Sequence, residues 1–252
     1  MEKYLRRRLA RRFSIIGKEY KFNVSINKKG ITVNDRDYFR AIEYLWTIGK
    51  NGKSQIKNCP KLKKSNHIDG TINKAKKYKI DGWVGTFEKQ KNIEDGNNSL
   101  VILARGKLIH EDILKDLKEA GLFTKYIIGE INANFVDINN KPDMATSDRQ
   151  NLKEDDPRFI ELKKYIQEKI LKTIQHDWVG WRRDNSTKQA LENKTINSWY
   201  TSLSPDKQKY AKKLFGTIGS FPSDSIEEKK ELYKHGILAF EKLALKDTCV
   251  FR

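Results

Sequence analysis

The amino-acid sequence predicts an α+β protein, with a mixed β-sheet and a few helices over residues 1–150 and a helical domain over residues 151–252. Two observations predict this division. Short apolar runs typical of strands, such as residues 82–87 and 99–104, lie in the first part. Cap residues followed by long helical stripes lie in the second part. No run approaches the roughly 20 consecutive apolar residues of a membrane span, so we expect no membrane partner and a cytoplasmic protein.

The chain should open with an amphipathic helix that ends near Gly17. Leu5, Leu9, Phe13 and Ile16 recur at helical spacing, and arginines fill the other faces. No capping residue precedes this helix, so we expect that further chain preceded Met1 in a longer protein.

The next segments predict a hairpin, a helix and a loop. Strand alternation around a turn at residues 27–30 predicts the hairpin, and the aromatic-rich residues 36–48 predict a short helix. Residues 49–79 are rich in Lys, Asn, Gly and Ser, which predicts a flexible, basic loop or insertion.

The sheet should continue from Ile80. Residues 83–87 and 99–104 read as strands, and a turn at residues 105–107 leads into residues 108–109. Residues 111–120 should form a helix closed by a glycine. Residues 126–136 should form another strand, interrupted by a bulge at Gly129.

Four helices should follow. Asp156 with Pro157 starts the first, which is followed by a second over about residues 187–201. Ser204-Pro205 starts the third. A capping box at Ser225 and Glu228 starts the fourth.

Positive charge is concentrated in one third of the chain. The net charge is +18, and residues 1–80 hold 22 Lys and Arg against 6 Asp and Glu, a net charge of +16. Such a local excess favours contact with DNA phosphates, although a solvated face of a Lys-rich protein would look similar. The candidate contacts are Arg7, Arg8, Arg11, Arg12, Lys61, Lys63, Lys64, Lys74, Lys76, Lys77 and Lys79.

The sequence yields no catalytic or metal-ligand candidates. Residues 49–54 resemble a phosphate loop but have the wrong glycine spacing. The acidic-x-Lys triplets of a metal-dependent nuclease, at residues 116–118 and 192–194, fall on predicted helices. The four histidines are widely spaced, and Cys59 and Cys249 stand alone, as in a reducing compartment.

A polar loop at residues 144–150 can donate several hydrogen bonds to an anion. It carries Ser147, Arg149 and Gln150, and an Arg side chain can bind a phosphate with two parallel bonds. The alternative is an ordinary polar loop that caps the following helix.

Three stretches, LRRRLARRFSII (5–16), GWVGTF with SLVILARGKLI (82–109) and ATSDRQ (145–150), together resemble the second half of prokaryotic GHKL-type ATPases, above all MORC-like ATPases of bacterial restriction and defence systems. The resemblance implies a transducer domain with a ribosomal-protein-like βαβ fold. It also implies that Ser147, Arg149 and Gln150 sense a nucleotide phosphate. The ATP-site motifs of that family are absent from this sequence.

The resemblance therefore implies a nucleotide-sensing, DNA-contacting portion of an ATPase that is not catalytic alone. No cofactor is expected in this chain, and ATP and Mg belong to a missing or partner domain. DNA, that ATP-binding domain and a second copy of the chain are the implied partners. Two alternatives stay open: a stand-alone nucleic-acid-binding module, and a nuclease whose site the sequence does not reveal.

Overall fold

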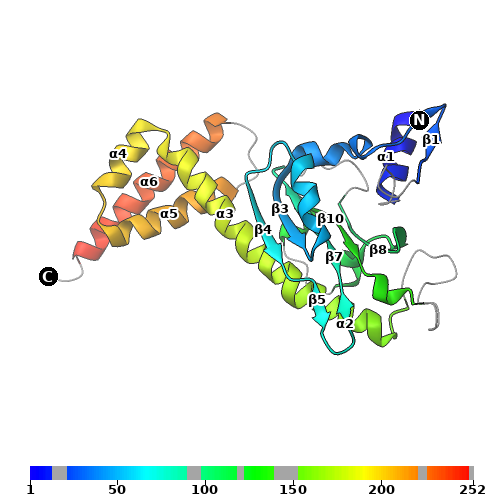
Figure 1. The fold of residues 1–252 in the computed structure, drawn as a ribbon. Helices are drawn as coiled ribbons and strands as arrows, with labels where there is room; N and C mark the ends of the chain where they lie inside the picture. Colours follow the sequence, from blue (N-terminus) through cyan, green and yellow to red (C-terminus); the bar gives the residue numbers. More distant parts are fainter. Residues whose placement is uncertain (13–21, 90–97, 118–121, 139–152, 221–225, 250–252) are drawn as a thin grey trace. The chain divides into compact units, whose positions relative to one another are not determined.

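The computed structural model describes residues 1–12, 22–89, 98–117, 122–138, 153–220 and 226–249. They belong to two compact units, Met1–Gln175 and His176–Arg252. We call these the sheet unit and the helical unit (Figure 1).

The sheet unit is built on a six-stranded mixed sheet in the order β4-β3-β7-β10-β8-β9. Its strands are β3 (Ile42–Ile48), β4 (Lys64–Ile68), β7 (Asp81–Phe87), β8 (Leu100–Ala104), β9 (Lys107–His110) and β10 (Ile127–Asn132). The pairs β3–β4 and β10–β8 are parallel, and the other pairs are antiparallel. The predicted α+β class with a mixed sheet is confirmed.

The central strands are buried on both faces. Every residue of β3 and β8 is buried, as is nearly every residue of β7 and β10. One core cluster joins Tyr38, Phe39 and Cys59 to side chains of β3, β7 and β10. Because both faces are covered, these strands read as continuous apolar runs and not as alternating ones.

The N-terminal elements form a small packed group beside the sheet. They are α1 (Glu2–Arg12), β1 (Ser25–Ile26), β2 (Lys29–Gly30) and η2 (Val33–Asp35). Asn27 and Lys28 adopt positive φ angles of 50° and 63° between the two strands, as a tight hairpin turn requires. The predicted first helix and hairpin are therefore confirmed, while the predicted helix end at Gly17 lies outside the described residues.

Two predictions for residues 36–79 were wrong. A single short turn, η3 (Asp37–Ala41), precedes strand β3, where the aromatic run had predicted a helix. Residues 49–79 contain η4 (Asn51–Asn58), strand β4 and the hairpin β5 (Thr71–Asn73) with β6 (Tyr78–Lys79). Backbone hydrogen bonds to β3 organise the segment despite its polar side chains.

Strands β7 and β8 and the turn at Arg105–Gly106, where both φ angles are positive, are as predicted. The predicted helix at residues 111–120 is a single turn, η6 (Ile113–Asp116), in the described part. Gly129 pairs in unbroken register with Val84 and Leu100, so the predicted bulge there is wrong. Two further turns, η7 (Leu122–Tyr126) and η8 (Asn134–Val136), flank β10.

The helices predicted to start at Pro157 and Pro205 begin there, but the predicted second helix over residues 187–201 is wrong, because these residues hold the end of one helix and most of another. The helices of this region are α2 (Pro157–Tyr165), a π-helical segment (Ile166–Leu171), α3 (Lys172–Leu191), α4 (Lys194–Ser202), α5 (Pro205–Ser220) and α6 (Ile226–Cys249). The Asp156 side chain accepts a hydrogen bond from the Arg158 amide at 2.8 Å, and the Asn193 side chain caps α4. Among the described residues, no helix is long and apolar enough to span a membrane.

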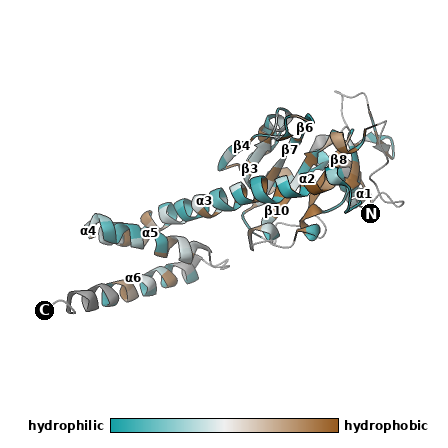
Figure 2. Ribbon diagram, turned by 90° about the horizontal axis from the view of Figure 1, so that it is seen from below, coloured by the Kyte–Doolittle hydropathy of each residue, from teal (hydrophilic) through white to brown (hydrophobic). Residues whose placement is uncertain are grey.

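The helical unit has a core of its own. Buried residues from four helices, Ala190, Ile196, Phe215, Ile218 and Tyr233, form one cluster. Figure 2 colours most of α3 and α5 as hydrophilic. The mainly helical C-terminal region predicted from the sequence is therefore confirmed.

Candidate nucleic-acid interface and acid–lysine cluster

Strand β4 presents an exposed, basic edge. It is the terminal strand of the described sheet, and the side chains of Lys64, Ser65, Asn66 and His67 are all exposed. Only Ile68 of this strand is buried, so packing against the core does not explain why the strand carries lysine, serine, asparagine and histidine. These four side chains therefore lie at the surface of the sheet unit, where His67 Nδ1 is 3.0 Å from Thr47 Oγ1.

The β5–β6 hairpin and the residue Asp69 that precedes it are held to α2 by three hydrogen bonds. The Glu161 carboxylate receives hydrogen bonds from Lys76 and, at 3.3 Å, from Asn73, and the Tyr165 hydroxyl donates to the Asp69 carbonyl. These contacts give the hairpin a defined position in the sheet unit. The backbone that carries the lysines of the hairpin turn therefore has a defined position.

The predicted lysines divide into two groups. Lys63 and Lys76 are engaged in ion pairs with Glu43, Glu88 and Glu161. The remaining predicted lysines are exposed, and we call them the basic edge: Lys61, Lys64, Lys74, Lys77 and Lys79. Among the described residues, no carboxylate forms an ion pair with Lys61, Lys74, Lys77 or Lys79, so the charge of these four lysines is exposed to solvent.

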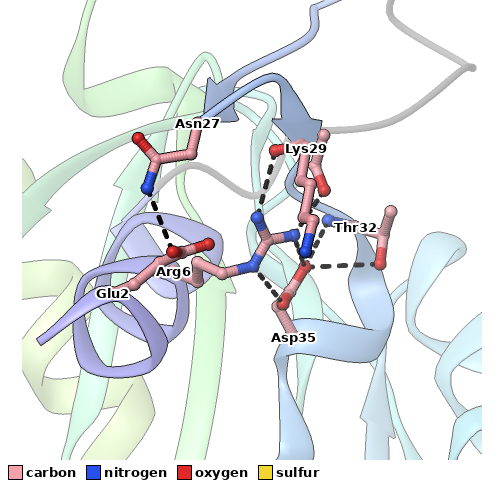
Figure 3. Close-up of polar contacts among 7 residues, drawn as sticks. Glu2, Arg6, Asn27, Lys29, Thr32 and Asp35 are labelled. Carbon is pink, nitrogen blue, oxygen red and sulfur yellow. Dashed lines mark hydrogen bonds and ion pairs between the residues drawn. The ribbon is translucent and has the colours of Figure 1, made fainter.

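The arginines of α1 are partly committed to the fold. Arg6, which was not a candidate, binds Asp35 at 3.0 Å and the backbone carbonyls of Lys29 and Gly30, tying α1 to the hairpin (Figure 3). Arg11 donates to the Ser99 side chain and carbonyl, and burial lowers its pKa. Arg11 is therefore a structural residue.

The other N-terminal candidates differ in exposure. Arg8 is exposed and lies over the Tyr4 ring at 5.3 Å, while Arg7 is half-buried. The Arg12 side chain lies outside the described residues, as do Ser147, Arg149 and Gln150 of the predicted phosphate-sensing loop. The predicted lysines that stay exposed therefore belong to the region of β4 and the β5–β6 hairpin, and among the described α1 side chains Arg8 is the exposed arginine.

A second cluster joins three side chains at one end of the sheet. Lys63 Nζ lies 3.1 Å from Glu43 Oε1 and 3.1 Å from Glu88 Oε1. Glu43 is the extra residue where the β3–β7 register shifts between Ile42 and Tyr44, so a β-bulge sets its direction. Bulges of this kind often re-aim a side chain at functional sites.

The cluster favours a charged lysine between two carboxylates. Burial opposes the charge, but the two carboxylates outweigh it, and the pKa of Lys63 is raised. Glu43 is almost fully buried, with 4% of its side chain exposed, whereas half of the Glu88 side chain is exposed. Two carboxylates and a lysine from neighbouring strands are also the groups with which a metal-dependent nuclease holds a cation and a phosphate.

Sequence reasoning missed this cluster because its members are far apart in the chain. Lys63 follows Glu43 by 20 residues and precedes Glu88 by 25. The available signal was a single acidic residue, Glu43, inside the otherwise apolar and aromatic run that became β3. In the parts of the chain that the structure describes, no set of three or more His, Cys, Asp or Glu residues is arranged to hold a metal ion.

Comparison with known proteins identifies a different relative from the one that the sequence motifs implied. Over 199 residues, 78% of its length, the chain is 37% identical to the "Putative type II restriction enzyme HgiDII" of Herpetosiphon aurantiacus. The match covers 33% of that protein, so the chain spans about a third of its relative's length. No protein-family model and no solved structure matches the chain.

These findings correct the resemblance to GHKL-type ATPases. No ATPase family model matches, and the one protein reported above is named for restriction and not for ATP hydrolysis. The described parts of the first two stretches form an arginine-rich helix and mostly buried strands, which are features common to many α+β proteins, and the third stretch lies outside the described residues. The transducer assignment, the ATPase function and the expectation of a chain without an enzymatic role were therefore wrong.

The expectation that ATP and Mg belong to another domain stays a prediction that no finding tests. So does the expectation of a homodimer. The alternative of a nuclease is better supported by the comparison than the ATPase was.

Proposed function

We propose that this chain is part of a restriction endonuclease and that its sheet unit holds the DNA substrate through phosphate contacts. The observation that carries the proposal is the 37% identity over 199 residues to a protein named as a type II restriction enzyme. The basic edge supports it, because five exposed lysines lie on β4, just before it and on the adjoining hairpin. The confinement of a +16 net charge to residues 1–80 supports it further.

Lysine ammonium groups act on DNA mainly as point charges. They neutralise phosphates and release counterions, so binding weakens steeply as salt rises and depends little on base sequence. The basic edge therefore fits a positioning role. Sequence recognition would need side chains that reach base edges, and exposed Asn66 and His67 on β4 are the groups nearest to that requirement in this edge.

The proposal is tested by charge reversal in the purified chain. Lys61, Lys74, Lys77 and Lys79 are changed together to Glu, and binding to a 20-base-pair duplex is followed by fluorescence anisotropy between about 50 and 200 mM salt. We expect a loss of affinity of tenfold or more and a shallower salt dependence. The matched control reverses four exposed lysines elsewhere in the sheet unit, Lys107, Lys115, Lys125 and Lys164. Equal losses in both variants, or no binding by the unchanged chain, would contradict the proposal.

The acid–lysine cluster supports DNA cleavage as the second part of the proposal. Glu43 and Glu88 would hold a divalent cation, which would replace some of the hydrogen bonds that they now receive from Lys63. The Lys63 ammonium would then stabilise negative charge on the phosphate. The cation would supply a nucleophilic water and polarise the phosphate oxygen. The roles of the protein are to fix two carboxylates at one sheet end and to exclude bulk water around the buried Glu43.

Cleavage is tested by following the nicking of supercoiled plasmid in two reactions, one with Mg²⁺ and one with EDTA and no added Mg²⁺. Glu88→Gln keeps the size of the half-exposed side chain, and we expect it to abolish Mg²⁺-dependent nicking while DNA binding persists. Glu111→Gln, at another exposed carboxylate of the sheet unit, is the matched control. Nicking that survives Glu88→Gln would remove the cluster from the mechanism without touching the DNA-binding proposal.

A further inference from the structure

We infer that the helical unit carries a second surface for duplex DNA on the outward face of α5, apart from the basic edge of the sheet unit. This inference rests on the proposed DNA-acting function. The surface consists of four exposed residues, which we call the α5 face: Lys209, Tyr210, Lys212 and Lys213.

The α5 face follows from the geometry of one helix. At about 100° per residue, the three lysines span an arc of about 100° on the side opposite the buried Ala211, Phe215 and Ile218. The buried side packs into the core of the helical unit, so the orientation of α5 is fixed by that core. The lysines therefore point away from the unit together.

The corner before α5 is also held in place. Only Leu203 and Ser204 separate α4 from α5. The Gln208 side chain donates hydrogen bonds to the carbonyls of Tyr200, at 3.3 Å, and Leu203, at 3.1 Å. The short connection and these bonds fix the start of α5 against the end of α4, which suits a helix that must meet a rigid duplex.

The charge pattern has no explanation in helix stability. Lys209 lies three and four residues before Lys212 and Lys213, and like charges at these spacings destabilise a helix. The partner of Lys209 is Asp206 at 3.2 Å, and both side chains are at least 75% exposed, so this surface ion pair contributes little. A polyanion placed against the face would turn the repulsion into attraction.

Tyr210 supplies a second kind of contact. Its side chain is 61% exposed, and Lys213 Nζ lies 5.6 Å from its ring centroid. An exposed aromatic ring between lysines can pack against sugar or the edge of a groove while its hydroxyl donates to a phosphate. Three lysines and one tyrosine on a single helix face together fit the phosphates and sugars of a nucleic-acid backbone.

The test is a triple reversal, Lys209→Glu with Lys212→Glu and Lys213→Glu, in the whole chain. The matched control reverses three exposed lysines on other helices of the same unit, Lys188, Lys194 and Lys242, and so makes the same change in net charge. Binding to a 20-base-pair duplex is measured by anisotropy across a salt series, and circular dichroism checks that both variants fold.

We expect the α5 variant to bind at least tenfold more weakly at about 0.1 M salt. We also expect the slope of log affinity against log salt to fall by about three, because each phosphate contact contributes roughly 0.9. Tyr210→Ala should weaken binding severalfold, whereas Tyr210→Phe should lose less. The control should keep most of both the affinity and the slope.

The outcomes separate this inference from the proposed function. If the unchanged chain binds DNA and the α5 variant binds as well as the control, the inference is overturned and the basic edge remains the DNA surface. A chain that binds no duplex at all overturns both. If the α5 variant fails to fold, the single substitution Lys213→Gln, with Lys242→Gln as its control, decides the question by the same salt series.

Discussion

Arg36 and Glu130 form an ion pair of 3.2 Å inside the sheet unit, where each side chain is no more than 5% exposed. Arg36 also donates to the Ala10 carbonyl at 2.8 Å, and the Tyr38 hydroxyl donates to Glu130 at 3.0 Å. One buried pair therefore connects the end of α1, the η3 segment and strand β10. This connection holds the N-terminal helix, and with it the exposed Arg8, against the sheet.

Removing one member of this pair should be costly. Arg36→Met leaves the Glu130 carboxylate buried with fewer partners, and we expect a loss of about 3–5 kcal/mol in unfolding free energy. Hydrogen exchange of the β10 amides reports this loss for the sheet unit alone. The double variant Arg36→Met with Glu130→Gln should recover part of the stability, because it leaves no unpaired charge. A single variant as stable as the double one would contradict this account.

Lys63→Met should also destabilise the sheet unit. It removes the ammonium that lies 3.1 Å from the nearly buried Glu43, and we expect a loss of about 1–3 kcal/mol. Lys63→Arg keeps the charge and should lose less. The control is Lys61→Met, two residues away and exposed, which should change the urea midpoint very little. Similar midpoints for Lys61→Met and Lys63→Met would show that the cluster does not stabilise the fold.

His110 should make stability depend on pH. Its side chain is 3% exposed, Nε2 lies 2.9 Å from Asp116 Oδ2, and Asp112 is also nearby. Burial lowers the pKa of His110 despite these two carboxylates. The unfolded chain takes up the proton near pH 6.5, and the folded chain takes it up only at lower pH. The stability contributed by neutral His110 is therefore complete above about pH 6.5 and is lost as pH falls below that value.

The His110 effect is measured by unfolding at pH 7.5 and pH 5.0. His110→Gln should reduce the difference in unfolding free energy between the two conditions. His176→Gln, at a ring that is 90% exposed, is the control and should leave the difference unchanged. An unaltered pH dependence in His110→Gln would assign the effect to other groups.

Gly129 should not tolerate a side chain. A Cβ at this position would lie 2.7 Å from both the Trp83 carbonyl oxygen and Leu100 Cδ1. We expect Gly129→Ala to lower stability by about 1–3 kcal/mol, since β7 and β8 on either side would have to move. Gly30→Ala is the matched control, because nothing lies within 4 Å of a Cβ there. Thermal unfolding of both variants checks the prediction, and equal melting temperatures would refute it.

Much of the fold could be predicted from local signals. Asp156 with Pro157 and Ser204 with Pro205 mark helix starts because capping and proline geometry act within one turn. The helix predicted over residues 36–48 was wrong because β3 is buried on both faces, so its side chains do not alternate between apolar and polar. In the run of Tyr44, Leu45 and Trp46, the order of apolar and polar residues therefore does not distinguish a strand from a helix.

The sites were harder to predict because distant partners decide which charges remain exposed. The charge excess of residues 1–80 identified the basic region. It could not show that Lys76 is bound by Glu161, 85 residues later, or that Arg11 is bound by Ser99, 88 residues later. The α5 face was not predicted from the sequence, because the lysines near residue 210 lie in a part of the chain with almost balanced charge. The packing of Phe215 and Ile218 into the core shows that the side of α5 with these lysines faces away from it.

The composition of β4 also bears on whether two copies of the chain can pair along this edge of the sheet. A terminal strand offers its backbone to any other extended segment, and repulsion between like-charged side chains is one way to prevent such pairing. With Lys64 on β4 and Lys61 just before it, two copies brought edge to edge would repel each other. The lysines proposed to attract DNA would thus also discourage the chain from stacking on itself into fibrous aggregates.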